Sequence, residues 1–172
     1  MKTEQQYFEE AKTLEQYMND MTTKKEEFIE ILKTEKPHIL VITEDWCGDA
    51  MMNNAIVRKI AEAGNLDIRT VYRDENLELM DQYLTNGGRS IPVYLLLSQD
   101  GEVISKWGPR AEMVQKFVME GRAKFPDKED PAFEDIQKKF YEQMTQEFIA
   151  NKEFHLAVYE EIRSSWLPIL QK

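Results

Sequence analysis

Apolar and polar positions recur with two different periods along this chain, and the changes of period divide it into elements. Residues 3–32 carry apolar side chains at roughly helical spacing, which predicts one or two amphipathic helices. Residues 38–43 form a short apolar run with β-branched side chains, typical of a strand buried on both faces. Helical spacing returns from about Cys47 and stops at Gly64-Asn65. A buried strand that leads directly into a helix is therefore expected.

The order of a strand followed by a helix is repeated once, and a predicted β-hairpin comes next. An alternating segment at residues 66–72 predicts a second strand, and residues 74–86 predict a helix that stops at a Gly pair. Two further apolar runs, at 93–97 and 103–107, are joined by a loop with an Asp-Gly pair, which favours a β-hairpin. A last helix of this unit is expected over about 110–121. The order predicts a mixed sheet with helices on both faces.

The C-terminal third reads as helical. Residues 124–131 are polar and contain two prolines, which is typical of a linker, and the apolar residues beyond them keep helical spacing with an interruption near Asn151. This stripe predicts a long helix or a helical hairpin. It would either fold back onto the N-terminal helices or form a homodimer or partner contact. We expect one domain over 1–172, with N-terminal helices in 1–35, an α/β core in 36–122 and a C-terminal helical extension in 131–172.

The composition of the chain limits the partners and the cellular compartment that we expect. The net charge of −10 disfavours nucleic acid and anionic membrane surfaces. No apolar run approaches the ~18 residues of a spanning helix, and the first residues lack the apolar core of a signal peptide, so a cytoplasmic location is expected. The two histidines, His38 and His155, lie far apart without acidic or Cys clusters at ligand spacing. No metal site is expected.

The single cysteine stands in a recognisable context. Trp46-Cys47-Gly48-Asp49-Ala50 comes directly after the first predicted strand and before a predicted helix. A second segment, Gly88-Arg89-Ser90-Ile91-Pro92-Val93-Tyr94-Leu95, enters the predicted hairpin. The two segments, their separation and the order of elements over residues 36–121 resemble the thioredoxin family, whose usual motif is Trp-Cys-Gly-Pro-Cys.

This resemblance implies a fold and a site. The fold would be an α/β thioredoxin-like three-layer α/β/α sandwich with a mixed sheet, extended by helices at both ends. Cys47 would be the catalytic nucleophile, and no cofactor is implied. The proline of the second segment would be cis and would pack against the nucleophilic sulfur. The residues that would present the sulfur or line the substrate groove are Trp46, Gly48, Asp49, Ala50, Ser90, Ile91 and Pro92.

Opposing effects act on the Cys47 thiol. A helix N-terminus favours the thiolate through its unpaired N–H groups and its dipole. Glu44, Asp45 and Asp49 lie close in sequence and would raise the thiol pKa, and we expect them to form a solvated acidic rim. Val41 occupies the position where the family often has a buried proton-transferring Asp. The sequence leaves the net activation of Cys47 open.

Ala50 replaces the second cysteine of the motif, which dithiol reduction needs in order to release the substrate. Three hypotheses follow. In the first, Cys47 exchanges with protein thiols and disulfides: it attacks a disulfide to form a mixed disulfide, and an external low-molecular-weight thiol resolves it. Alternatively, the fold is a redox-inactive protein-binding module that holds a peptide beside Ser90-Ile91-Pro92 by strand-like pairing. In the third, Ala50 is an engineered replacement made to trap a partner.

Overall fold

The computed structural model describes the backbone of residues 14–172 and the side chains from residue 22 onward. The earlier part of the predicted N-terminal helix, with Phe8 and Ala11, lies outside the described residues. The elements in chain order are α2 (Leu14–Glu35), β1 (His38–Thr43), α3 (Gly48–Gly64), β2 (Ile68–Tyr72), α4 (Leu77–Met80), β3 (Val93–Leu97), β4 (Val103–Trp107), α5 (Glu112–Arg122), α6 (Phe133–Ala150) and α7 (Lys152–Leu170).

The strands in the described part of the chain form one mixed sheet of four, in the order β2-β1-β3-β4. Strand β1 pairs parallel with β2, so that Ile39 lies beside Ile68, and antiparallel with β3, where Ile39 lies beside Leu96. Helix α3 provides the crossover that the parallel pair requires. Strands β3 and β4 form the predicted antiparallel hairpin, with an irregularity at Leu96/Leu97.

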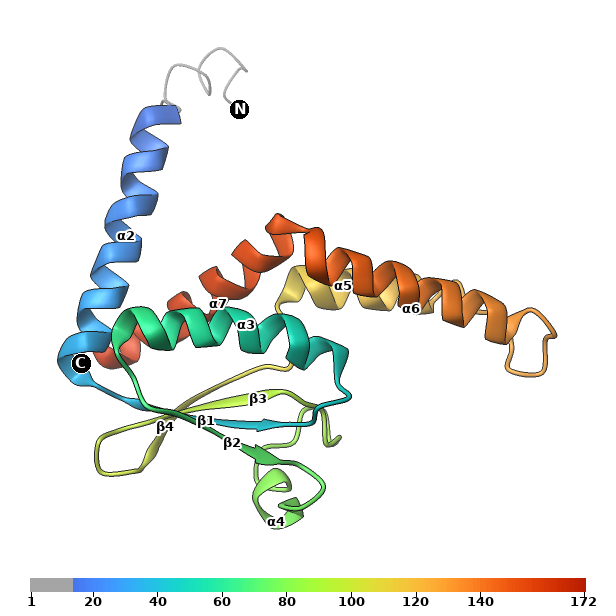
Figure 1. Ribbon diagram of the computed structural model, residues 1–172, viewed down its shortest axis with the longest axis horizontal. Helices are drawn as coiled ribbons and strands as arrows, with labels where there is room; N and C mark the ends of the chain where they lie inside the picture. Colours follow the sequence, from blue (N-terminus) through green and yellow to red (C-terminus); the bar gives the residue numbers. More distant parts are fainter. Residues whose placement is uncertain (1–13) are drawn as a thin grey trace, which may run out of the picture.

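The sheet separates two apolar clusters of unequal size. Side chains alternate along β1, so that Ile39 and Val41 join one cluster and Ile42 the other. The larger cluster lies under α2, α3, α5 and α7, and the smaller one lies toward α4. Figure 1 shows these helices on opposite sides of the sheet. The three-layer sandwich with a mixed sheet is confirmed.

The C-terminal extension contributes to the larger cluster. Ile162 and Trp166 of α7 are fully buried, as are Phe28 and Leu32 of α2, and all four belong to one cluster. The apolar stripe of α7 therefore packs against the N-terminal helix within this chain. The division into three parts with the predicted boundaries stays a prediction.

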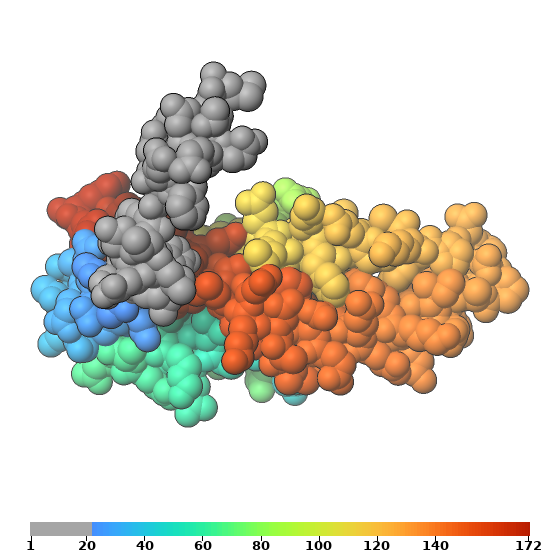
Figure 2. All heavy atoms as spheres, turned by 90° about the horizontal axis from the view of Figure 1, so that it is seen from above, coloured from blue at the N-terminus to red at the C-terminus, as the bar shows by residue number. Residues whose placement is uncertain are grey.

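Helices α5 and α6 run together away from the sheet. Figure 2 shows them, in yellow and orange, as an arm that extends from the body of the molecule. Phe140 of α6 stacks on Phe117 of α5 with ring centroids 5.8 Å apart, and it lies 5.6 Å from the ring of Phe125. Helix α6 ends at Ala150, and the next residue, Asn151, caps α7 by accepting hydrogen bonds from the N–H groups of Glu153 and Phe154. The predicted interruption near Asn151 is thus a corner between two helices.

The helix predicted over residues 74–86 is wrong in its length, because α4 ends at Met80. Past that point Lys106 of β4 donates hydrogen bonds to the carbonyl oxygens of Tyr83 (3.1 Å) and Leu84 (3.0 Å). Thr85 then pairs with Gly88 in an isolated β-bridge. The ammonium group of Lys106 thus binds two carbonyl groups of the chain that follows α4 and holds this loop against β4.

Candidate active site

Cys47 lies at the junction between β1 and α3. It is the N-cap residue of α3, with extended backbone angles (φ −83°, ψ 115°), and its carbonyl oxygen accepts a hydrogen bond from the N–H of Met51 at 3.2 Å. The N–H groups of Asp49 and Ala50 lie in the open first turn and act on the sulfur, lowering its pKa. The local sequence therefore places the thiol where a helix dipole favours negative charge.

Burial of the sulfur opposes that effect. Cys47 is only 7% exposed and packs in the smaller apolar cluster with Ile42, Ala50 and Ile91. Its Sγ–H donates a hydrogen bond to the carbonyl oxygen of Ile91 at 3.6 Å. Burial raises the pKa of the Cys47 thiol and the Asp49 carboxylate raises it further, which outweighs the lowering by the helix N–H groups and by Arg110. The thiol is thus held in its protonated form at neutral pH.

An ion pair lies beside the thiol that sequence spacing did not reveal. Arg110, just before α5, donates from Nε to Oδ1 of Asp49 at 2.7 Å and from Nη2 to Oδ2 at 2.8 Å. The two side chains are only 14% and 11% exposed, and Arg110 also donates to Gln115 at 2.9 Å. A bidentate pair in a partly buried setting fixes both side chains and neutralises the carboxylate nearest the sulfur.

The expected solvated acidic rim is wrong for two of its three members. Asp49 is buried in the pair with Arg110. Glu44 is also buried, and its Oε1 accepts a hydrogen bond from the backbone N–H of Asp74 at 2.9 Å. Asp45 is exposed as expected. These carboxylates fasten neighbouring segments to the site, because hydrogen-bond donors from other elements reach them.

The proline segment lies against the sulfur, with Ile91 and Pro92 buried and Ser90 half-buried. The Ile91-Pro92 peptide bond is cis. The backbone of Gly108 passes so close to this segment that a side-chain Cβ at position 108 would overlap the carbonyl oxygen of Pro92. Gly108 also has φ +116°, a conformation that favours glycine. The loop after β4 therefore packs directly against the backbone of the proline segment.

The outer surface of the site is formed by Trp46 and Gly48, both exposed. The guanidinium carbon of Arg73 lies 5.1 Å from the centroid of the Trp46 ring, a cation–π contact. Arg73 also donates a hydrogen bond to the carbonyl oxygen of Arg89 at 3.2 Å. One arginine after β2 thus touches both the cysteine segment and the loop that leads to Pro92.

Two polar side chains fasten α3 on its inner side. Asn53 is fully buried and donates from Nδ2 to the carbonyl oxygen of Pro109 at 2.8 Å, while its Oδ1 has no hydrogen-bond partner among the described residues. Tyr94 of β3 donates its hydroxyl to Oδ1 of Asn54 at 2.6 Å, and burial raises the Tyr94 pKa well above its usual value. Tyr94 is therefore a neutral structural donor.

Comparison with known proteins assigns the family. A family model described as thioredoxin matches residues 1–128, well over half of the chain. The chain belongs to the thioredoxin family. No curated protein matches it. Two solved structures are similar in outline. A protein of unknown function from Pseudomonas aeruginosa is 18% identical over 73% of this chain and 72% of its own (TM-score 0.46). An HIV 4E10 epitope scaffold is 15% identical over 93% and 99% (TM-score 0.42).

This thioredoxin family member has one cysteine in its sequence and alanine at the second motif position. None of the helices in the described part of the chain is long and apolar enough to cross a bilayer. Residues 14–172 also bring together no group of three His, Cys, Asp or Glu side chains that could hold a metal ion. Of the contacts around Cys47, sequence reasoning missed those of Arg110 and Arg73, whose positions depend on the folded loops.

Proposed function

We propose that this thioredoxin family member carries out monothiol thiol-disulfide exchange through Cys47. The observation that supports this most directly is the placement of its sulfur at the N-terminus of α3, within 3.6 Å of the Ile91 carbonyl oxygen in the proline segment. A substrate disulfide that approaches over Trp46 and Gly48 would reach the sulfur from the exposed side. The substrates in this proposal are protein disulfides or mixed disulfides with small thiols.

The exchange proceeds in two balanced steps. The Cys47 thiolate attacks one sulfur of the substrate disulfide, forms a mixed disulfide with it and releases the other sulfur as a thiolate, which takes up a proton. Because Ala50 cannot attack the mixed disulfide, a low-molecular-weight thiol attacks it from solution. That thiol leaves as a disulfide with the substrate fragment, and Cys47 regains its proton.

The raised pKa of Cys47 shapes the expected kinetics. A small thiolate fraction slows the first step, although a thiolate of high pKa is intrinsically more nucleophilic. A thiol of high pKa is also a poor leaving group, so the external thiol displaces Cys47 from the mixed disulfide slowly. Both steps should therefore be slow, and intact-protein mass spectrometry of quenched samples would measure how much mixed disulfide is present during turnover.

The decisive experiment compares wild type, Cys47→Ser and Ala50→Cys on a small disulfide and on a peptide carrying a glutathione mixed disulfide, each with several low-molecular-weight thiols. Turnover by wild type that is lost in Cys47→Ser would support the proposal. Activity that appears only in Ala50→Cys would contradict it, because the fold would then be competent and the natural site inactive. Circular dichroism of the three proteins controls for folding.

A second candidate function is a redox-inactive binding module, and the burial of the sulfur favours it. In this alternative the edge beside Ser90, Ile91 and Pro92 binds an extended peptide and the thiol of Cys47 serves only in packing. A pull-down would then recover the same partner with Cys47→Ser as with wild type. Loss of the partner in Cys47→Ser would exclude this alternative and favour thiol-disulfide exchange.

A further inference from the structure

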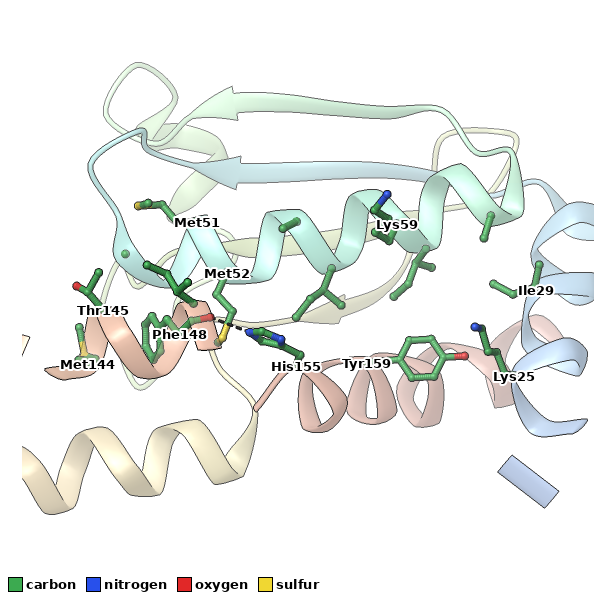
Figure 3. A pocket seen from close by; sticks show the side chains of 16 residues that line it. Lys25, Ile29, Met51, Met52, Lys59, Met144, Thr145, Phe148, His155 and Tyr159 are labelled. Atoms are coloured by element: carbon green, nitrogen blue, oxygen red, sulfur yellow. Dashed lines mark hydrogen bonds between the residues drawn. The ribbon is translucent and has the colours of Figure 1, made fainter. Parts of the chain in front are cut away.

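A groove of about 730 Å³ runs along the outer face of α3, between that helix and α2, α6 and α7. This volume lies within the range of about 300–1,000 Å³ that is usual for small-molecule sites. Figure 3 shows its walls. Gly48 and Met51 lie at one end, next to the cysteine segment, and Lys25 and Tyr159 lie at the other. The sulfur of Cys47 faces the proline segment and is not part of this lining.

The walls of the groove are apolar along most of its length. Met51 and Ile149 are 66% and 65% exposed at its mouth, although both are large apolar side chains. Methionine walls adapt to flexible apolar ligands. The apolar residues that line it are Ile29, Met51, Met52, Ala55, Ile56, Ile60, Ala63, Met144, Phe148 and Ile149.

The polar groups of the groove are placed unevenly. His155, midway along, is engaged with the Phe148 carbonyl oxygen at 2.8 Å. Lys25 makes no ion pair with any residue that the structure describes, and Lys59 lies 3.6 Å from Glu62, a carboxylate that Arg58 already binds at 2.8 Å. The buried hydroxyl of Tyr159 has no hydrogen-bond partner among the described residues and points toward Lys25. This end thus offers the amine of Lys25 and an unused hydroxyl, while the Lys59 amine points away from them on the other side of α3.

We propose that this groove binds a single-chain amphiphile with an anionic head, such as a long-chain fatty acid. The head would lie at Lys25 and the Tyr159 hydroxyl, where the ammonium group complements its charge and the hydroxyl can donate a hydrogen bond. The chain would follow α3 toward Met51, and α3 rises about 1.5 Å per residue, which gives room for a long acyl chain. The proposal does not depend on thiol exchange by Cys47.

The test is a titration of the full-length protein with a dansyl-labelled undecanoate, displaced by unlabelled palmitate below its micelle concentration. Binding should be saturable in wild type and in Cys47→Ser. Ala55→Trp places a large ring in the groove from an exposed helix position and should weaken binding about tenfold or more. Lys25→Glu should weaken palmitate binding about threefold or more through charge repulsion.

Lys24→Glu is the matched control, because it makes the same charge change one residue away and outside the lining. It should leave palmitate affinity within error of wild type. The uncharged dodecanol should bind more weakly than dodecanoate in wild type, and this difference should shrink in Lys25→Glu. An absence of saturable binding, equal affinity in Ala55→Trp, or equal effects of the two lysine changes would overturn the proposal.

Two other occupants of the groove would be detected with the same samples. A second copy of the chain would appear as a dimer in native mass spectrometry that Ala55→Trp converts to monomer. The N-terminal segment of this chain would appear as a competitor, so that Phe8→Glu would raise probe affinity about tenfold or more. Either result would overturn the fatty-acid proposal and assign the groove to that occupant.

Discussion

The two faces of the sheet differ in how they are covered. On one face α2, α3, α5 and α7 bury a cluster that includes Phe28, Ile162 and Trp166. On the other, the four-residue helix α4 and its following loop cover a smaller cluster built around Ile42 and Met80. Apolar burial stabilises a fold roughly in proportion to area, so most of the hydrophobic stabilisation lies on the first face.

The sulfur of Cys47 belongs to the thinly covered face. Its neighbours there are Ile91 and Ala50, while the helix that carries it packs on the heavily covered face. The backbone that positions the thiol is therefore anchored on one side, and the surface that a substrate would meet lies on the other. We therefore expect truncations of buried side chains to cost more stability on the heavily covered face than on the thinly covered one.

The largest effect is expected for Trp166→Ala in the heavily covered face. Trp166 is fully buried, and truncation of such a ring should lower the free energy of unfolding by about 4 kcal/mol. Urea unfolding followed by circular dichroism measures it. Trp166→Phe keeps most of the packing and removes an indole N–H that has no partner among the described residues, so it should cost clearly less. Equal losses in the two variants would contradict this account.

The next largest effect is expected for Arg110→Ala beside the thiol. It leaves the Asp49 carboxylate largely buried without a partner, which should lower the free energy of unfolding by about 3 kcal/mol. The control is Arg89→Ala, which removes an exposed bidentate pair with Asp81 and should cost under about 1 kcal/mol. Similar losses in both would show that the Asp49 pair is not effectively shielded from water.

A smaller effect is expected for Met80→Ala in the thinly covered face. Met80 is fully buried, but one short helix and a loop can close over part of the cavity, so the loss should be about 2 kcal/mol. Met80→Leu keeps the volume and is the control. If Met80→Ala destabilises the protein as much as Trp166→Ala, the two faces are equivalent in stability and the comparison fails.

The smallest effect is expected in the pH dependence of Cys47. Its raised pKa predicts that iodoacetamide modifies the folded protein more slowly at pH 8 than the same chain in denaturant, with a midpoint above that of an ordinary thiol. Because the folded pKa exceeds the unfolded one, this thiol stabilises the fold fully below the unfolded pKa and less as pH rises through the folded pKa. Modification faster than in denaturant would contradict the observed burial.

Local patterns predicted the strands and the start of α3, because strand burial and helical spacing both depend on residues that are close together in the sequence. The Trp-Cys-Gly motif and the proline segment likewise located Cys47 and Ile91 before any geometry was known. The length of α4 could not be predicted, since Lys106, a residue of another strand, binds the carbonyl groups that follow it. Periodicity over a short window does not report such a contact with a distant strand.

The electrostatics of the site were the least predictable part. Counting charges near Cys47 in sequence gave an acidic environment, whereas folding brings Arg110 onto Asp49 and buries Glu44 under the Asp74 amide. The pairing depends on where the loop after β4 places Arg110. Gly108, two residues before Arg110, packs closely against the backbone of Pro92. In the sequence, this backbone contact is marked only by the presence of a glycine.

The corner at Asn151 couples two distant parts of the molecule mechanically. Its side chain caps α7 and also donates to Glu147 of α6 at 2.7 Å, and His155 bonds the Phe148 carbonyl across the same turn. These hydrogen bonds hold α6 and α7 at a defined angle where the two helices meet. Because Phe148 lies just before that corner and lines the groove, the same hydrogen bonds also fix the position of one groove wall.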